Sequence, residues 1–327
     1  KKYLRYCKDK TVAEVIYYRT VMNVNRFNQD LKRYTELIQT ESAKNRDLVM
    51  PANVIKGING KEQEIFDRFV LTDALASMFK GYRVKSILGL LTLIVVAFLF
   101  FHLYLGLVQK PIMLMMYPLL LTGGLLWYFF AKRQGYEYKH EDYRALAEAT
   151  RIQLFWRLIG ICDNVADHYL RIHKGELEWI RYALRVWNLP TEPCEFVKYK
   201  DFDNHSNNYD ITLIHWVEKQ KNWFRTRGEE DFLKLKKLEK LGNHFFTFGF
   251  SIALLLLILE IFRPNSLMVW GINFEFTRHI CIVMVALPLA IAAAIHGYAD
   301  KMVLAEQGKQ YSSMADLYGN AHTKLES

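Results

Sequence analysis

Two pairs of long apolar segments, each joined by a short turn, are the feature that most constrains the fold of this chain. Residues 86–108 and 111–131 form the first pair, and residues 245–262 and 279–295 form the second. A bilayer core is roughly 30 Å thick, so about 20 mostly apolar residues cross it as a helix. A helix also satisfies its own backbone hydrogen bonds in lipid. The sequence therefore predicts an all-α membrane protein in which four transmembrane helices form two duplicated hairpins, with a cytoplasmic helical bundle.

Shifts between apolar and charged sequence divide the chain into five parts. In order, these are cytoplasmic helices leading into the membrane (1–84), a first transmembrane hairpin (85–131), a cytoplasmic helical region (132–244), a second transmembrane hairpin (245–298) and a C-terminal cytoplasmic helix (299–327).

Apolar residues at three- and four-residue steps predict further helices outside the apolar segments. They cover residues 12–44, 143–185, 211–224, 229–242 and 300–325. Another helix is expected to begin near Glu62 and to run directly into the first apolar segment. Between the helix predicted over residues 12–44 and the one expected near Glu62, Pro51, Gly57 and Gly60 predict a loop over residues 45–60.

The positions of Lys and Arg predict the orientation of the chain, which carries a net charge of +9. Several of these residues flank the ends of the apolar segments that point away from the hairpin turns: Lys80, Arg83, Lys85, Lys132, Arg133, Lys234, Lys236, Lys237, Lys240, Lys301 and Lys309. The turns carry only Lys110, Arg263 and Arg278. Because cytoplasmic flanks are enriched in Lys and Arg, both termini are expected in the cytoplasm. Cations so placed indicate a lipid bilayer as partner rather than nucleic acid.

The two halves of the chain show a weak internal repeat. A shift of about 158 residues places residues 142–148 on residues 300–306 and the first apolar segment on the third. The identities are sparse, so a chance match remains the alternative to a true duplication. Repeats of this kind in transporters often place a functional path at their shared interface.

The sequence lacks the signatures of an enzyme. It contains no Gly-rich phosphate loop, serine-nucleophile elbow or paired-His zinc motif. The four cysteines lie far apart and lack metal-ligand spacing. Asp163, Asp167, His168 and His173 fit solvated helix positions, or a hydrogen-bond network between helices, better than a metal site. An Asp- and Asn-rich stretch at 201–207 lacks the central Gly and final Glu of an EF-hand loop. We therefore expect no catalytic residue, cofactor or metal ion.

Ionisable residues inside the apolar segments are the first candidates for a functional site, because charge is costly in a bilayer. His102 lies late in the first segment, and Glu260 lies near the end of the third. Arg263 follows Glu260 by three residues, a spacing at which helical side chains can pair. These three residues are pore or gating candidates. A simple Glu260–Arg263 ion pair at the membrane surface is the alternative.

Small residues indicate where helices approach closely in the membrane. Ala286, Ala290 and Ala294 repeat every four residues in the fourth segment, and Gly123 and Gly124 lie in the second. These five residues are predicted to form helix-packing surfaces.

Residues around both hairpins resemble a known family. The first hairpin lies between IFDRFVLTDALA (65–76) and DYRALAE (142–148), and the second between HWVEKQ (215–220) and DKMVLAEQ (300–307). This arrangement resembles the SLATT family, predicted two-helix membrane effectors of bacterial conflict systems. The runs ALAEATRIQLFW (145–156), VADHYL (165–170) and ELEWIR (176–181) resemble bacterial proteins with an N-terminal SLOG-type nucleotide-sensing module similar to that of TRPM channels.

The resemblance implies a homo-oligomeric effector of bacterial anti-phage defence, located in the inner (plasma) membrane. Such an effector would form a gated ion channel or a membrane-disrupting pore and would respond to a nucleotide signal. No sensor signature occurs in this sequence, so the sensing domain is expected N-terminal to Lys1. A passive anchor for a signalling or enzymatic domain is the main alternative. A secondary transporter is less favoured, because no apolar segment is convincingly broken in mid-membrane, with Pro288 as a candidate break, and four helices per chain are few.

Overall fold

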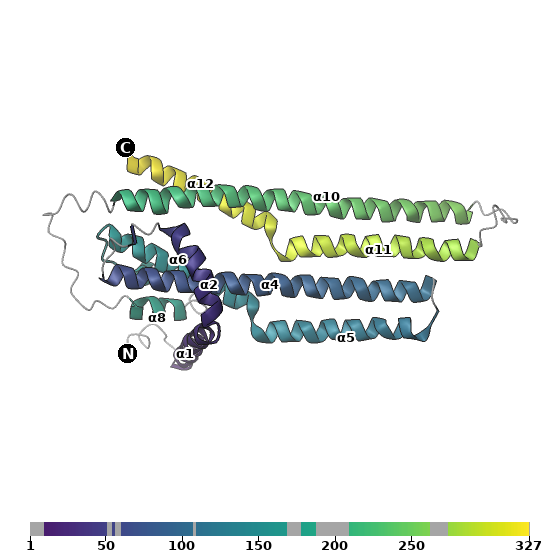
Figure 1. Ribbon diagram of the computed structural model, residues 1–327, viewed down its shortest axis with the longest axis horizontal. Coiled ribbons are helices and arrows are strands. Elements are labelled where there is room, and N and C mark those ends of the chain that lie inside the picture. The colour runs from purple at the N-terminus through teal and green to yellow at the C-terminus, as the bar shows by residue number, and fades with distance from the viewer. Residues whose placement is uncertain are drawn as a thin grey trace. The chain divides into compact units, whose positions relative to one another are not determined.

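The structure is a computed structural model, and the elements that it describes are helices (Figure 1). The described residues are 10–50, 54–55, 60–106, 109–168, 178–187, 209–261 and 274–326.

The chain divides into two compact units. Unit 1 comprises Lys1–Tyr82, Gly135–Gln220 and Tyr318–Ser327, and unit 2 comprises Arg83–Gln134 and Lys221–Leu317. Unit 2 therefore includes both apolar hairpins together with residues that the sequence assigned to the polar regions on either side of the second hairpin.

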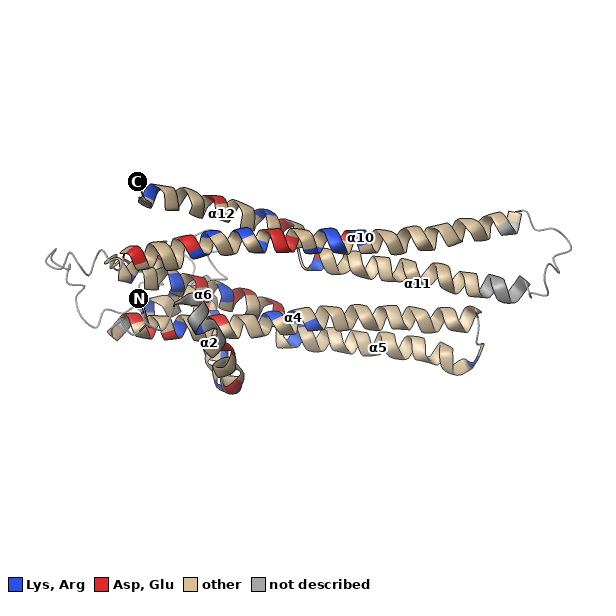
Figure 2. Cartoon of the chain, turned by 45° about the horizontal axis from the view of Figure 1, so that its top comes forward, with Lys and Arg blue, Asp and Glu red and all other residues tan. Residues whose placement is uncertain are grey.

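Within the described ranges, four helices are long and apolar enough to cross a membrane. Their apolar stretches belong to α4 (Gly60–Gly106), α5 (Pro111–Gln134), α10 (Lys219–Ile261) and α11 (Phe274–Lys301). In Figure 2 these stretches are almost free of charged residues, which gather on the adjoining parts of the chain. The predicted all-α membrane fold with four transmembrane helices is confirmed.

The helix expected to begin near Glu62 is α4, which continues without interruption into the first apolar segment. Pro111 begins α5, a position that suits proline because the first backbone N–H of a helix has no partner within it.

The prediction of a single helix over residues 12–44 was wrong. The structure has α1 (Lys10–Arg33) and α2 (Thr35–Val49), separated at Tyr34, where φ is −112°. The Tyr34 ring packs edge-on against Phe79 with 5.7 Å between centroids and is partly buried against the core of unit 1. The helical spacing of apolar residues continues through the break, so the sequence pattern does not reveal it.

The prediction of a single helix over residues 143–185 was also wrong. The structure has three helices there: α6 (Tyr136–Leu158), α7 (Val165–His168) and α8 (Glu178–Trp187). Gly160 follows α6 with φ of +79°, a left-handed conformation that glycine adopts without strain. The Gln153 side chain donates to the Asp163 carbonyl and accepts from the Val165 N–H at 2.8 Å, which holds the chain reversal.

The two helical runs predicted at 211–224 and 229–242 are instead nearly continuous. A π-helical turn, η3 (Leu213–Glu218), leads directly into α10. The helix predicted over 300–325 is interrupted at its start, because α11 ends at Lys301 and α12 (Leu304–Glu326) begins three residues later. Val303 lies in this break with φ of +52°.

Both halves of the chain show the same order of elements. The order α4, α5, α6 in the first half corresponds to α10, α11, α12 in the second. In each half, a residue with positive φ separates the second apolar helix from the helix that follows. This residue is Gly135 in the first half, with φ of +66°, and Val303 in the second.

Aromatic rings fill the core of unit 1. Phe79 contacts Tyr143 edge-on with 5.6 Å between centroids, and Tyr143 contacts Trp179 at 6.2 Å. Such pairs contribute about 0.5–1.5 kcal/mol each beyond the burial of their area. A second buried cluster around Phe66 and Phe155 packs α4 against α6. The core thus joins α1, α4, α6 and α8.

Candidate functional site

One side of α10 carries a row of polar side chains that runs from its charged part into its apolar part. Asn243, Thr247 and Ser251 follow one another at four-residue steps, so they share one face of the helix. Lys240 precedes Asn243 on the same side. All four residues are exposed on the described surface of the chain. We call Asn243, Thr247 and Ser251 the α10 polar row.

The hydroxyl groups of the polar row are bonded within the helix. The Thr247 hydroxyl donates to the Asn243 carbonyl at 2.9 Å, and the Ser251 hydroxyl donates to the Thr247 carbonyl at 2.8 Å. This pattern lets Ser and Thr lie in an apolar environment without an unsatisfied donor. The hydroxyl oxygens keep lone pairs that can accept further hydrogen bonds from water or from another helix.

The opposite side of α10 packs closely against α11. A Cβ atom added at Gly249 would lie 3.1 Å from the Leu289 Cγ and 3.2 Å from the Val285 carbonyl oxygen. At Gly242 it would lie 2.7 Å from the His296 Nε2. Both glycines are buried. This glycine face therefore holds α10 on α11 and directs the polar row away from α11.

His102, predicted as a pore or gating residue, lies half-buried in α4. Its Nδ1 is 2.8 Å from the Phe98 carbonyl oxygen, so Nδ1 carries the proton that it donates. The imidazole stacks on the Phe98 ring with 5.9 Å between centroids and meets the Phe101 ring edge-on. Only Nε2 is then left to accept a hydrogen bond from water or another group.

The other two pore or gating candidates lie at the far end of the second hairpin. Glu260 belongs to the last turn of α10. The Glu260 side chain and the whole of Arg263 lie outside the described residues, so their pairing stays a prediction.

The predicted packing residues differ in what they contact. Gly124 is buried, and a Cβ atom there would lie 3.7 Å from the Leu90 Cδ1 of α4. Gly123 is exposed and faces open space. The α4–α5 contact also includes the Trp127 indole, which donates to the Ser86 carbonyl at 3.2 Å.

In α11, Ala286, Ala290 and Ala294 are all half-buried. Of these, Ala294 lines a cavity between α4, α10 and α11.

Unit 1 contains a buried ionic cluster centred on Asp30 of α1. The Lys139 ammonium lies 2.8 Å from one carboxylate oxygen, and the Tyr143 hydroxyl donates to the same oxygen at 2.6 Å. The ammonium also lies 4.9 Å from the centre of the Phe79 ring. Burial, followed by the hydrogen bond to Asp30, raises the pKa of the Tyr143 hydroxyl well above its usual range. Tyr143 therefore acts as a donor to the carboxylate at physiological pH.

A second polar chain runs along α6. Arg144 pairs with Asp73 of α4 at 2.6 Å and with Glu148 at 2.5 Å. Arg151 also pairs with Glu148 and donates to the Gln220 side-chain oxygen of α10 at 2.9 Å. Burial raises the pKa of the Asp73 carboxyl above its usual value, against the lowering effect of Arg144. Through these side chains, α6 contacts both α4 and the start of α10.

Two buried polar groups lie at the π-helical turn before α10, one in the residue that precedes the turn and one within it. The Thr212 hydroxyl and the His215 Nδ1 are buried and have no hydrogen-bond partner in the described part of the chain. Burial, and then the nearby Lys219, lower the pKa of His215 below its usual value. Single π-helical turns occur frequently at functional sites, where they replace regular helix geometry.

Within the described residues, no three His, Cys, Asp or Glu side chains are close enough together to hold a metal ion. Asp163 and His168 lie 3.5 Å apart at an exposed position. His168 belongs to α7, whereas Asp163 precedes that helix.

Comparisons with known proteins find no matching family model, curated protein or solved structure for this chain.

Proposed function

We propose that this chain is an oligomeric membrane effector that forms a gated ion channel or a membrane-disrupting pore. The α10 polar row carries the proposal. In this proposal, the row lines the conducting path between copies of the chain, and α11 packs against the opposite side of α10 at Gly242 and Gly249.

Thr247 and Ser251 lie inside the apolar segment of residues 245–262, where lipid offers no hydrogen bond to their hydroxyl oxygens. Water or a polar partner helix solvates such oxygens better than lipid does. Copies of the chain bury the row by packing around it or by enclosing water along it. A passive anchor needs no such row, because an entirely apolar helix spans the bilayer more favourably.

The π-helical turn and the α6 network support a gating role for unit 1. Gln220 in the first turn of α10 is bonded to Arg151, and α10 continues from there to the polar row. A change of state in unit 1 would alter this attachment. A ligand drives such a change only by binding the two states with different affinity.

The wider setting is part of the same proposal. The SLATT-like arrangement favours bacterial anti-phage defence, with the chain in the inner membrane and both termini in the cytoplasm. The activating signal would be a nucleotide, sensed by a domain N-terminal to Lys1.

Ion flux from liposomes that contain the full-length protein tests the proposal. Flux is measured with and without a panel of NAD-derived nucleotides. The proposal expects flux that one nucleotide switches on. An absence of flux under every ligand, with the protein shown to be inserted and folded, would contradict it and would favour a passive anchor.

Cysteine modification then tests the conducting path itself. Thr247→Cys and Ser251→Cys are treated with a charged, membrane-impermeant thiol reagent during flux. Modification should reduce flux in both variants. Phe246→Cys serves as the matched control, because Phe246 is exposed but lies on another side of α10. Equal effects at all three positions would exclude the polar row as the path.

A further inference from the structure

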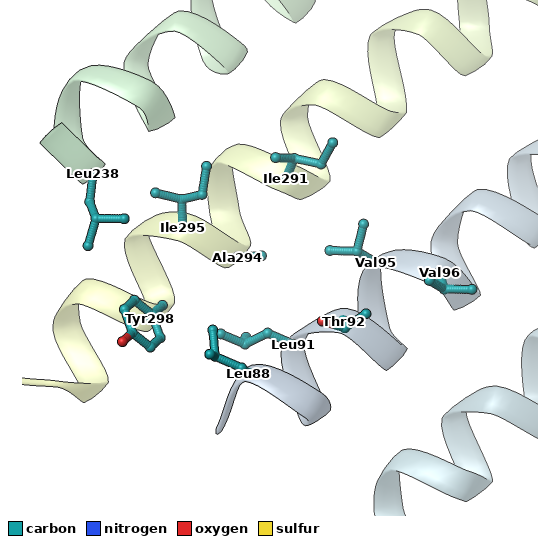
Figure 3. A pocket seen from close by; sticks show the side chains of 10 residues that line it. All are labelled: Leu88, Leu91, Thr92, Val95, Val96, Leu238, Ile291, Ala294, Ile295 and Tyr298. Atoms are coloured by element: carbon teal, nitrogen blue, oxygen red, sulfur yellow. The ribbon is translucent and has the colours of Figure 1, made fainter. Parts of the chain in front are cut away.

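Unit 2 contains an apolar cavity of about 400 Å³ within its membrane-spanning part. Leu91 and Val95 of α4 form one wall, and Ile291 and Ile295 of α11 form the other (Figure 3). Leu238 of α10 contributes to one end. The volume lies within the roughly 300–1,000 Å³ that ligand pockets commonly have. Water has few partners on such walls, so an apolar chain is the favoured occupant.

One end of the cavity is polar and basic. Tyr298 lines this end, and the Lys234 ammonium donates to its hydroxyl at 3.3 Å while lying 5.4 Å from the centre of its ring. Lys85 of α4 and Lys301 of α11 lie three residues from the lining residues Leu88 and Tyr298. The acidic residues nearest to these lysines in sequence are Asp300, beside Lys301, and Asp231, which lies 3.9 Å from Arg227.

We infer that this cavity binds an acyl chain of an anionic phospholipid, with the lipid phosphate beside Lys234. The long apolar wall matches the acyl chain, and the basic end matches the negative headgroup. Basic sites between transmembrane helices on the cytoplasmic side are suited to anionic headgroups. This inference does not depend on the proposed channel function, because a lipid site can stabilise unit 2 whether or not ions pass.

Native mass spectrometry on the detergent-purified protein tests the site. The protein is titrated with phosphatidylglycerol and with phosphatidylcholine of the same acyl chains. We expect one tightly held phosphatidylglycerol and about a fivefold preference over phosphatidylcholine, the factor that one Lys near an anionic headgroup contributes. Equal affinity for the two lipids would overturn the inference.

Two pairs of variants separate the site from lipid at the general protein surface. Ala294→Phe fills the cavity and should lower phosphatidylglycerol binding at least fivefold, whereas Ala293→Phe lies at an exposed position and should not. Lys234→Gln should abolish the preference for phosphatidylglycerol, whereas Lys236→Gln removes the same charge elsewhere on α10 and should keep it.

Equal binding by the two alanine variants would overturn the inference, as would an unchanged preference in Lys234→Gln. If Ala294→Phe fails to fold, Lys234→Gln decides the question, because it leaves the cavity walls intact. Flux measurements on the same variants report separately on the proposed channel.

Discussion

Lys139 and Asp30 form an ion pair across 109 residues of sequence, and their side chains are only 11% and 8% exposed. Loss of one partner from a buried pair leaves an uncompensated charge in the interior. Lys139→Met should therefore lower the free energy of unfolding of unit 1 by about 3–5 kcal/mol. Chemical unfolding followed by tryptophan fluorescence measures the change, since Trp179 lies in the same core.

An exposed pair provides the control for this prediction. Arg185 and Asp167 of unit 1 approach to 2.6 Å, but their side chains are 42% and 57% exposed. Arg185→Met should cost less than about 1 kcal/mol, because water screens exposed pairs. Similar losses in Lys139→Met and Arg185→Met would show that burial does not determine the strength of the first pair.

The two breaks with positive φ should respond in opposite ways to substitution. Val303 is a β-branched residue in a left-handed conformation, which costs about 1–2 kcal/mol relative to glycine. Glycine loses about 0.5–1 kcal/mol of that gain to chain entropy. Val303→Gly should therefore raise the thermal midpoint slightly.

Gly135→Ala is the matched substitution in the first half of the chain. It should lower the thermal midpoint, because Gly135 has positive φ and its added Cβ atom would overlap the Tyr138 ring. A loss of stability in Val303→Gly would show that the surroundings of Val303, rather than its backbone, determine the conformation of the break.

The buried carboxyl of Asp73 should make the stability of unit 1 depend on pH. Its pKa is raised from 3.8 by burial, so the folded state binds the proton more tightly than the unfolded chain. Between 3.8 and the raised pKa, the free energy of unfolding contributed by Asp73 falls as pH rises. Asp73→Asn removes this titration. As pH rises through that window, the free energy of unfolding of this variant should therefore fall less than that of the unchanged protein.

Thermal unfolding in detergent over a series of pH values measures the difference. Asp73→Glu retains a titrating carboxyl and should keep a pH-dependent slope. Parallel stability curves for the unchanged protein and Asp73→Asn would rule out the role given to this carboxyl.

Removal of the hydroxyls in the α10 polar row should reduce ion flux without preventing insertion. Thr247→Val and Ser251→Ala, combined in one chain, keep the size of both side chains nearly unchanged. Conductance should fall because these side chains then offer no oxygen to a passing ion or water molecule. The measurement is single-channel recording in planar bilayers.

A matched double variant should leave the conductance as it is. Leu254→Val and Leu257→Ala also alter exposed positions of α10 but remove no polar group. If this variant lowers the conductance as much as the hydroxyl variant does, the polar row has no special part in conduction.

The sequence predicts the membrane helices well and the interruptions poorly. The length and apolar character of α4, α5, α10 and α11 are local properties, so they can be read directly from the chain. The break at Tyr34 coincides with a tertiary contact to Phe79, and the break at Gly160 contains a residue with left-handed φ. In both places the helical spacing of apolar residues continues through the break. Nothing in the apolar periodicity marks them.

The polar row illustrates a different gap. Asn243, Thr247 and Ser251 occur at four-residue steps in the sequence, but none of them is ionisable, so the cost of charge in a bilayer does not single them out. Only the structure shows that this row lies opposite Gly242 and Gly249. The pairing of Asp30 with Lys139 is likewise beyond sequence reasoning, because no local pattern connects residues so far apart.

The assembly of unit 1 from three separate stretches has a consequence for how the protein is made. Arg151 meets Gln220, and the Tyr209 hydroxyl donates to the Leu325 carbonyl at 2.7 Å. Both hairpins are synthesised before Leu325 leaves the ribosome. Unit 1 therefore closes only after both membrane hairpins have been synthesised, and a chain that stops before α12 lacks the Leu325 contact of that unit. Contacts of such long sequence separation also form slowly, so the folding of unit 1 is completed after the membrane helices have emerged.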